Sequence, residues 1–208
     1  MQKRQHIGEK EIAILKFFYE RKSGHVRELL RSLGMYEHTL QKYLASLERD
    51  RLVSSKKVAN LKIYEPRLDN PIVRVFYSYF DLLRLNSIEF GRKMSIIDFV
   101  DGMKKIKMPY FVFLFGSTAG GNYRKESDID IITVCESVGK EFVRMNLDLC
   151  FDIKAVRGIK VSSIVMPKEE FVREMNNREN YALQSALDSG FPVFGNLTYY
   201  DVVSDRRV

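Results

Sequence analysis

Residues 110–134 of the chain read YFVFLFGSTAGGNYRKESDIDIITV. An apolar run of strand length, residues 110–115, leads directly into Gly116 and Ser117. After a polar loop, a second strand-like run begins at the pair Asp128 and Asp130. Residues two apart in a strand point to the same face, so the two carboxylates are expected to share one side of a sheet. The stretch therefore predicts two strands joined by a glycine-rich turn, with two acidic side chains beside it.

This combination favours a site for a metal ion and a triphosphate. Glycine lets the backbone approach a phosphate closely, and a following helix N-terminus supplies free N–H groups for it. Two converging carboxylates form an oxygen-rich site of the kind that Mg²⁺ prefers. Ile129 and Ile131, which alternate with the aspartates, are expected to face the core. Asp128 and Asp130 alone would be a common surface pattern, but the whole arrangement is much more specific.

Downstream of this stretch the elements alternate. The pattern predicts strands at 129–134 and 161–166, helices at 140–154 and 180–188, and a helix starting at Pro167. Upstream, residues 95–105 have helical spacing with Ser95 as the N-cap. Alternation of this kind favours a sheet with covering helices. We expect residues 95–208 to form one α+β or α/β domain with a mixed sheet.

The N-terminal third has a different organisation. Helical spacing is present at residues 9–19, 25–33 and 37–49, with Ser23 as the expected cap of the second helix and Gly34 as its end. Two short β-like pieces follow, at 53–55 and 61–64, separated by a lysine-rich turn. Three short helices and a basic hairpin predict a winged helix-turn-helix domain over residues 1–67.

The segment between these two parts, residues 68–94, is expected to be a connecting helix. Its stretch from 72 to 94 is helical in period and rich in aromatic residues. A stripe of this kind is more often buried than exposed. It could pack on either domain or form the interface of a twofold homodimer, for which Phe76 to Phe90 is the candidate region.

The net charge is concentrated in the N-terminal third. Residues 1–67 hold 15 Lys and Arg against 8 Asp and Glu, which accounts for the whole net charge of +7. A local basic field suits a polyanion such as double-stranded DNA. The candidate DNA contacts are the early residues of the third helix and the lysines of the wing, namely Thr39, Gln41, Lys42, Lys56, Lys57 and Lys62. A solvated basic surface or a protein–protein adaptor are the alternatives.

Composition narrows the class of protein. Apolar residues make up 45% and charged residues 29%, ordinary values for a globular protein with a core. There is no pattern of a signal peptide and no apolar run long enough to span a bilayer. The two cysteines, Cys135 and Cys150, lack metal-ligand spacing. We expect a cytoplasmic protein without a membrane partner.

Residues 95–193 resemble the minimal nucleotidyltransferase domain of the polymerase-beta superfamily, whose signature is Gly-Ser, a gap, then Asp-x-Asp. With the N-terminal part, the chain resembles archaeal-type winged-helix proteins that carry such a domain. The resemblance implies that Gly116 and Ser117 hold the β- and γ-phosphates of a nucleoside triphosphate. It also implies that Asp128 and Asp130 are catalytic and bind Mg²⁺.

Two departures from the family pattern bear on activity. Active members usually carry a third carboxylate on a later strand, and the matching position in this sequence is predicted to be Ser163. Many relatives also carry an arginine shortly after Gly-Ser, where this chain has Gly120 and Gly121, with Arg124 and Lys125 further on. A serine cannot bind metal in the role of a carboxylate, so the sequence leaves catalysis open.

Three functions follow from these features. The first is a DNA-binding transcriptional regulator whose C-terminal domain binds nucleotide and Mg²⁺. By resemblance alone it would be antitoxin-like, with a partner protein. The second is an active Mg²⁺-dependent nucleotidyltransferase that transfers a nucleoside monophosphate to a protein or a small molecule. The third is an inactive nucleotidyltransferase fold that serves only for dimerisation. A carboxylate within reach of Asp128 and Asp130 would favour the second.

Overall fold

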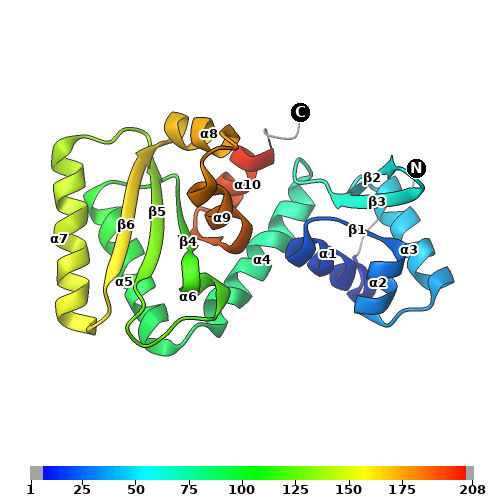
Figure 1. The fold of residues 1–208 in the computed structure, drawn as a ribbon, viewed down its shortest axis with the longest axis horizontal. Coiled ribbons are helices and arrows are strands. Elements are labelled where there is room, and N and C mark those ends of the chain that lie inside the picture. Colours follow the sequence, from blue (N-terminus) through cyan, green and yellow to red (C-terminus); the bar gives the residue numbers. More distant parts are fainter. Residues whose placement is uncertain (1–6, 205–208) are drawn as a thin grey trace. The chain divides into compact units, whose positions relative to one another are not determined.

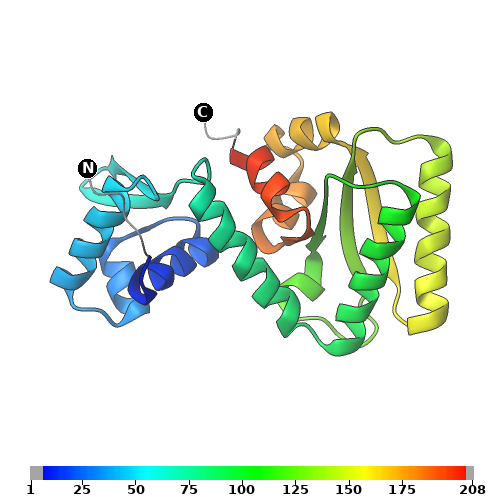
Figure 2. The ribbon, with the colours of Figure 1, turned by 180° about the vertical axis from the view of Figure 1, so that it is seen from behind.

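The computed structural model describes residues 7–204 and is a mixed α+β fold. It divides into two compact units, of which the first comprises residues 7–80 with 203–204 and the second Asp81–Val202. The division falls inside one helix, α4 (Pro71–Ser87), instead of at either end of the segment 68–94. Figures 1 and 2 show the elements of each unit.

The first unit contains three complete helices, the start of α4 and a three-stranded antiparallel sheet of order β1-β3-β2. Its elements are α1 (Glu9–Arg21), β1 (Gly24–His25), α2 (Val26–Leu33), α3 (Glu37–Arg49), β2 (Val53–Val58) and β3 (Leu61–Pro66). The predicted third helix is confirmed at both ends, and Gly34 ends α2 in the left-handed conformation. Ser23 does not cap α2, because His25 does so by accepting a hydrogen bond from the backbone N–H of Glu28.

Leucines from the helices form the core of this unit. Leu29, Leu40, Leu44 and Leu47 are fully buried, and Phe18 of α1 packs among the same elements. Burying a large aliphatic side chain contributes about 1.5–3 kcal/mol to the stability of the folded state. Several such side chains are buried together here, so this small unit has a core of its own. The spacing 40, 44 and 47 places one apolar face of α3 inward and leaves its other face to solvent.

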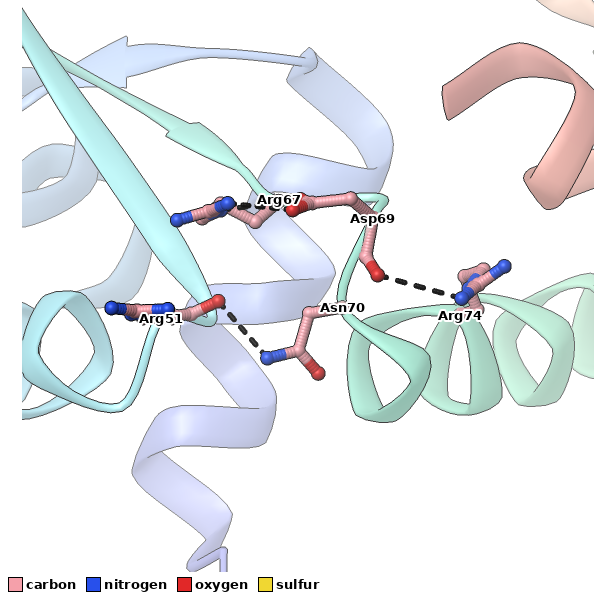
Figure 3. Close-up of polar contacts among 5 residues, drawn as sticks. All are labelled: Arg51, Arg67, Asp69, Asn70 and Arg74. Atoms are coloured by element: carbon pink, nitrogen blue, oxygen red, sulfur yellow. Dashed lines mark hydrogen bonds and ion pairs between the residues drawn. The ribbon is translucent and has the colours of Figure 1, made fainter. Parts of the chain in front are cut away.

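Polar contacts join the end of β3 to the start of α4, as Figure 3 shows. Arg67 pairs with Asp69 at 2.6 Å, and the side chain of Asn70 donates to the backbone oxygen of Arg51 at 3.0 Å. The Asn70 Oδ1 also accepts from the N–H of Ile72, which supplies a partner for the first turn of α4.

Two aromatic residues of α4, Tyr77 and Phe80, are turned into the first unit, whereas Tyr79 is exposed. Tyr77 and Phe80 are buried, and both rings contact Tyr19 of α1 at centroid distances of 5.1 and 5.3 Å. These two residues are therefore core residues, although they lie in the range proposed as a dimer interface.

The second unit is built on a four-stranded mixed sheet of order β6-β5-β4-β7. The strands are β4 (Phe111–Phe115), β5 (Ile129–Cys135), β6 (Val161–Pro167) and β7 (Phe191–Phe194). β5 runs parallel to β6 and antiparallel to β4, which in turn runs antiparallel to β7. The sequence did not predict β7 or the helix after it, α10 (Asn196–Ser204), because both are short and carry weak periodicity.

Helices cover the two faces of this sheet unequally. Helices α5 (Phe90–Ile106) and α7 (Lys140–Arg157) lie against the face that carries Ile129 and Ile131. On the opposite face, Phe111 packs on Phe171 of α8 (Lys168–Asn176) and on Tyr199 of α10. Helix α9 (Tyr181–Ser189) lies beside β4 on this side, as Figures 1 and 2 show.

The boundary between the two helices expected at 72–94 and 95–105 lies earlier in the chain than predicted. The chain leaves the helical conformation after Ser87 and starts α5 at Phe90, with the Glu89 carboxylate accepting from the N–H groups of Gly91 and Arg92. Ser95 is not a cap, because it lies fully buried within α5 and donates to the backbone oxygen of Gly91. None of the helices within residues 7–204 combines the length and apolar character needed to cross a membrane.

Candidate nucleotide-transfer site

Asp128 directly precedes β5 and Asp130 is the second residue of this strand, so strand alternation directs both side chains to one face of the sheet. Strand pairing places Asp130 beside Phe115 of β4 and beside Ser162 of β6. Ile129 and Ile131, which alternate with them, are fully buried on the other face. The predicted alternation is therefore confirmed, and the carboxylates are directed away from the helices α5 and α7.

The turn at Gly116 lies directly against Asp130. Gly116 has φ of +70°, and a Cβ atom at this position would collide with the Oδ2 atom of Asp130. The backbone conformation favours glycine because other residues rarely adopt it, and a Cβ atom here would also displace the Asp130 carboxylate. Gly116 also begins the short helix α6 (Gly116–Gly120), which lies within the glycine-rich segment. The structure thus brings together Gly116, Ser117 and both aspartates from separate parts of the chain.

Arg92 organises the loop between α6 and β5. Its side chain is 3% exposed, and its guanidinium donates to Thr118 Oγ1 and to the backbone oxygens of Arg124, Lys125 and Ser127, at 2.8–3.2 Å. It also stacks over the Tyr123 ring. The Thr118 hydroxyl in turn donates to the backbone oxygen of Asp128 at 3.4 Å. One buried cation thus holds both ends of the loop that carries the first aspartate.

Burial and two neighbouring charges change the pKa of Asp130. Burial, and secondly the negative charge of Asp128, raise the pKa of Asp130, while the Lys160 ammonium opposes them. Lys160 Nζ lies 2.5 Å from Asp128 Oδ2, and this hydrogen bond raises the pKa of the lysine. Lys160 directly precedes β6, and its backbone oxygen accepts from the N–H of Ile129. A cation is therefore already present beside the acidic pair.

The position of the third carboxylate was predicted wrongly. Ser163 is paired with Ile131, so it lies on the face covered by α7, and its buried Oγ has no hydrogen-bond partner within the described residues. Ser162 is the residue beside Asp130 on the open face. The error is one residue, which in a strand reverses the direction of the side chain. The residue that faces the aspartates is again a serine.

The donor set fits one divalent cation. Two carboxylates on one face, one of them partly desolvated, favour a bound cation because each raises the cost of the other's negative charge. Among residues 7–204, no group of three or more His, Cys, Asp and Glu side chains is arranged to hold a metal ion. Asp152 on α7 and Glu169 on α8 are exposed residues outside the sheet.

A pocket of about 260 Å³ lies along α6. It is lined by residues 118–121, by Tyr123, and by Arg84, Ser87 and Ile88. Arg84 donates to the backbone oxygens of Ala119 and Ser189 and stacks over Phe191 at 4.1 Å. A Cβ atom at Gly121 would meet nothing within 4 Å, so the chain borders open space at this residue.

The residues predicted to contact DNA lie on the first unit. Thr39, Gln41 and Lys42 are in the first two turns of α3, and Gln41 donates to Glu37 at 3.0 Å. In the β2–β3 hairpin, Lys56 pairs with Glu65 at 2.6 Å and Lys62 pairs with Glu48 at 3.0 Å. Lys42 and Lys57 are exposed.

Lys160, Arg92 and Ser162 were not among the predicted site residues. Strand alternation could have identified Lys160 and Ser162, since they lie two apart and share a face once the register of β6 is known. Arg92 gave no local signal, because its contacts are 26–35 residues away in the sequence.

The family match found by comparison with known proteins contains the residues of this site. Residues 94–188 match the family model described as Nucleotidyltransferase domain, which includes the glycine turn and both aspartates. Over 91 residues the chain is 36% identical to a Methanocaldococcus jannaschii protein whose name proposes a protein adenylyltransferase. The aligned part covers 41% of this chain and 84% of that relative.

Proposed function

We propose that this chain, which belongs to the nucleotidyltransferase domain family, transfers a nucleoside monophosphate from a nucleoside triphosphate to a hydroxyl group of a protein. The observation that carries the proposal is the contact between the Gly116 turn and the Asp130 carboxylate, with Asp128 on the same face. The relative's name supports a protein as acceptor and an adenylyl group as the group transferred.

The residues of the site have separate roles in this reaction. The backbone at Gly116 and Ser117 binds the terminal phosphates, and Asp128 and Asp130 hold one Mg²⁺ ion, which when bound stabilises the charge that develops on the phosphate oxygens. The acceptor oxygen forms a bond to the α-phosphorus, the bond from this phosphorus to the bridging oxygen breaks, and pyrophosphate leaves. The hydroxyl proton passes to solvent at the open face.

Label transfer tests this function. The purified chain is incubated with Mg²⁺ or Mn²⁺ and each of the four α-labelled nucleoside triphosphates, with and without a lysate of the source cells as a supply of acceptors. We expect label on protein, with release of pyrophosphate, and loss of both in Asp128→Asn and in Asp130→Asn. Absence of transfer with all four nucleotides, from protein shown to be folded, would overturn the proposal.

A second candidate function is binding of double-stranded DNA by the first unit, acting as a winged helix. Its support is the order of α2, α3 and the β2–β3 hairpin, together with the basic excess in residues 1–67. The family match at 94–188 does not extend to these residues, so this candidate depends on the first unit alone. An active transferase targeted by such a unit would combine both functions.

A further inference from the structure

Lys160 lies where a cation bound by Asp128 would compete with it. Its ammonium contacts Asp128 Oδ2, and strand pairing places the backbone of Lys160 next to the start of β5. The side chain of Lys160 is 58% exposed and that of Asp128 is 32% exposed. Exposed ion pairs contribute little to stability, so this pair is easily exchanged for other partners.

Lys160 and the turn at Gly116 lie on opposite sides of the two aspartates. In the sheet, β6 borders β5 on one side and β4 borders it on the other. Lys160 precedes β6, whereas Gly116 follows β4 and touches Asp130. A triphosphate held at Gly116 and Ser117 and extending over the aspartates would therefore come within reach of the flexible lysine stem.

The charges of the site leave room for such a role. Two carboxylates support one divalent cation, and the neighbouring residue on β6 that could add a third, Ser162, is neutral. A triphosphate carries more negative charge than one divalent cation offsets. A further positive group near the phosphates would complete the neutralisation.

We propose that Lys160 is the second cation of this site: it neutralises Asp128 in the free protein and binds the phosphates of the nucleotide when a divalent cation takes its place on Asp128. This inference rests on the proposed function for its nucleotide. It assigns a substrate-binding role to a residue outside the Gly-Ser and Asp-x-Asp pattern. Two consequences of opposite sign follow for a variant that lacks the ammonium.

The test measures two affinities in the full chain. Binding of Mn²⁺ alone is followed by electron paramagnetic resonance. Binding of α,β-methylene-ATP, which cannot undergo the transfer, is followed by calorimetry with Mg²⁺. For Lys160→Met we expect Mn²⁺ to bind several-fold tighter, since the competing ammonium is gone, and the nucleotide to bind about tenfold more weakly. Lys160→Arg should retain most of the nucleotide affinity. Lys105→Met, which removes an exposed lysine of α5, should behave as the wild type.

The outcomes separate this inference from the proposed function. Unchanged or weaker Mn²⁺ binding by folded Lys160→Met, or undiminished nucleotide binding, would overturn the role of Lys160. If the wild type binds both ligands and the variants change the two affinities as expected, but no label is transferred, the proposed function is overturned and Lys160 remains a phosphate-binding residue. Wild-type protein that binds neither ligand would overturn both.

Discussion

Asp130 is a residue at which stability and chemistry act in opposite directions. Burial raises its pKa, so ionisation of this carboxyl at neutral pH costs stability. When the pKa of Asp130 is higher in the folded than in the unfolded protein, this group favours the folded state most at a pH below its pKa in the unfolded chain, about 3.9. That contribution is lost as the pH rises through the pKa of the folded protein. A neutral isostere would avoid this cost, although it would lose a ligand for the cation.

We therefore expect Asp130→Asn to be more stable than the wild type at pH 7, by less than about 1 kcal/mol because the group is partly exposed. The gain should disappear below about pH 3.9, where both proteins are neutral at this position. Urea unfolding at a series of pH values measures the difference. A variant less stable than wild type at pH 7, or a gain that does not depend on pH, would contradict the argument.

A second prediction for single residues follows from the register in which β6 pairs with β5. Ser162→Asp places a carboxylate beside Asp130 on the open face, so Mn²⁺ should bind at least several-fold tighter. Ser163→Asp places the same group beneath α7, so we expect destabilisation by roughly 3 kcal/mol or more without tighter metal binding. Metal titration and urea unfolding of the two variants give the comparison. Tighter binding by Ser163→Asp would show that the register is wrong.

At the scale of elements, the loop from Gly121 to Asp128 depends on a helix far away in the sequence. Arg92→Met removes the donor for three backbone oxygens and for the Thr118 hydroxyl. We expect a loss of about 2–4 kcal/mol in unfolding free energy, and faster amide hydrogen exchange in this loop. Arg92→Lys keeps the charge but not the planar set of donors, so it should recover only part of the loss. Lys93→Met, one residue further along α5, is the control.

An intact exchange pattern in the loop of Arg92→Met would contradict this positioning role. A general loss of stability alone would not establish it either. The signature is faster exchange at residues 121–128 that exceeds the change in the β4–β5 core, together with weaker Mn²⁺ binding through the displaced Asp128.

Local pattern explains which elements could be predicted. Helix α3 was predicted to its ends because its leucine spacing and its flanking residues act within the helix itself. The break between α4 and α5 was expected at residues 94–95 but lies at 88–89, because it depends on Glu89 acting as a cap inside a continuous apolar pattern. Similarly, the two aspartates follow from strand alternation, whereas the register of β6, and with it the choice of Ser162 over Ser163, is set by pairing with β5.

For the whole molecule, charge separates the two units. The basic excess lies in residues 1–67, and the remaining residues hold equal numbers of acidic and basic side chains. Any affinity for DNA should therefore come from the first unit and fall steeply with salt. Within that unit the lysines differ, because Glu65 and Glu48 already neutralise Lys56 and Lys62.

We therefore predict that Lys42→Ala and Lys57→Ala each weaken binding to duplex DNA more than Lys56→Ala or Lys62→Ala, and each reduce the salt slope by about 1. Glu48→Gln should strengthen binding, since it frees the ammonium of Lys62. Fluorescence anisotropy at several salt concentrations measures both quantities, with Asp128→Asn as the control that leaves the first unit unchanged. Equal effects of all four lysines would mean that the ion pairs open on binding. An absence of binding at low salt would leave the first unit without a role in DNA recognition, so that the transferase domain would act without it.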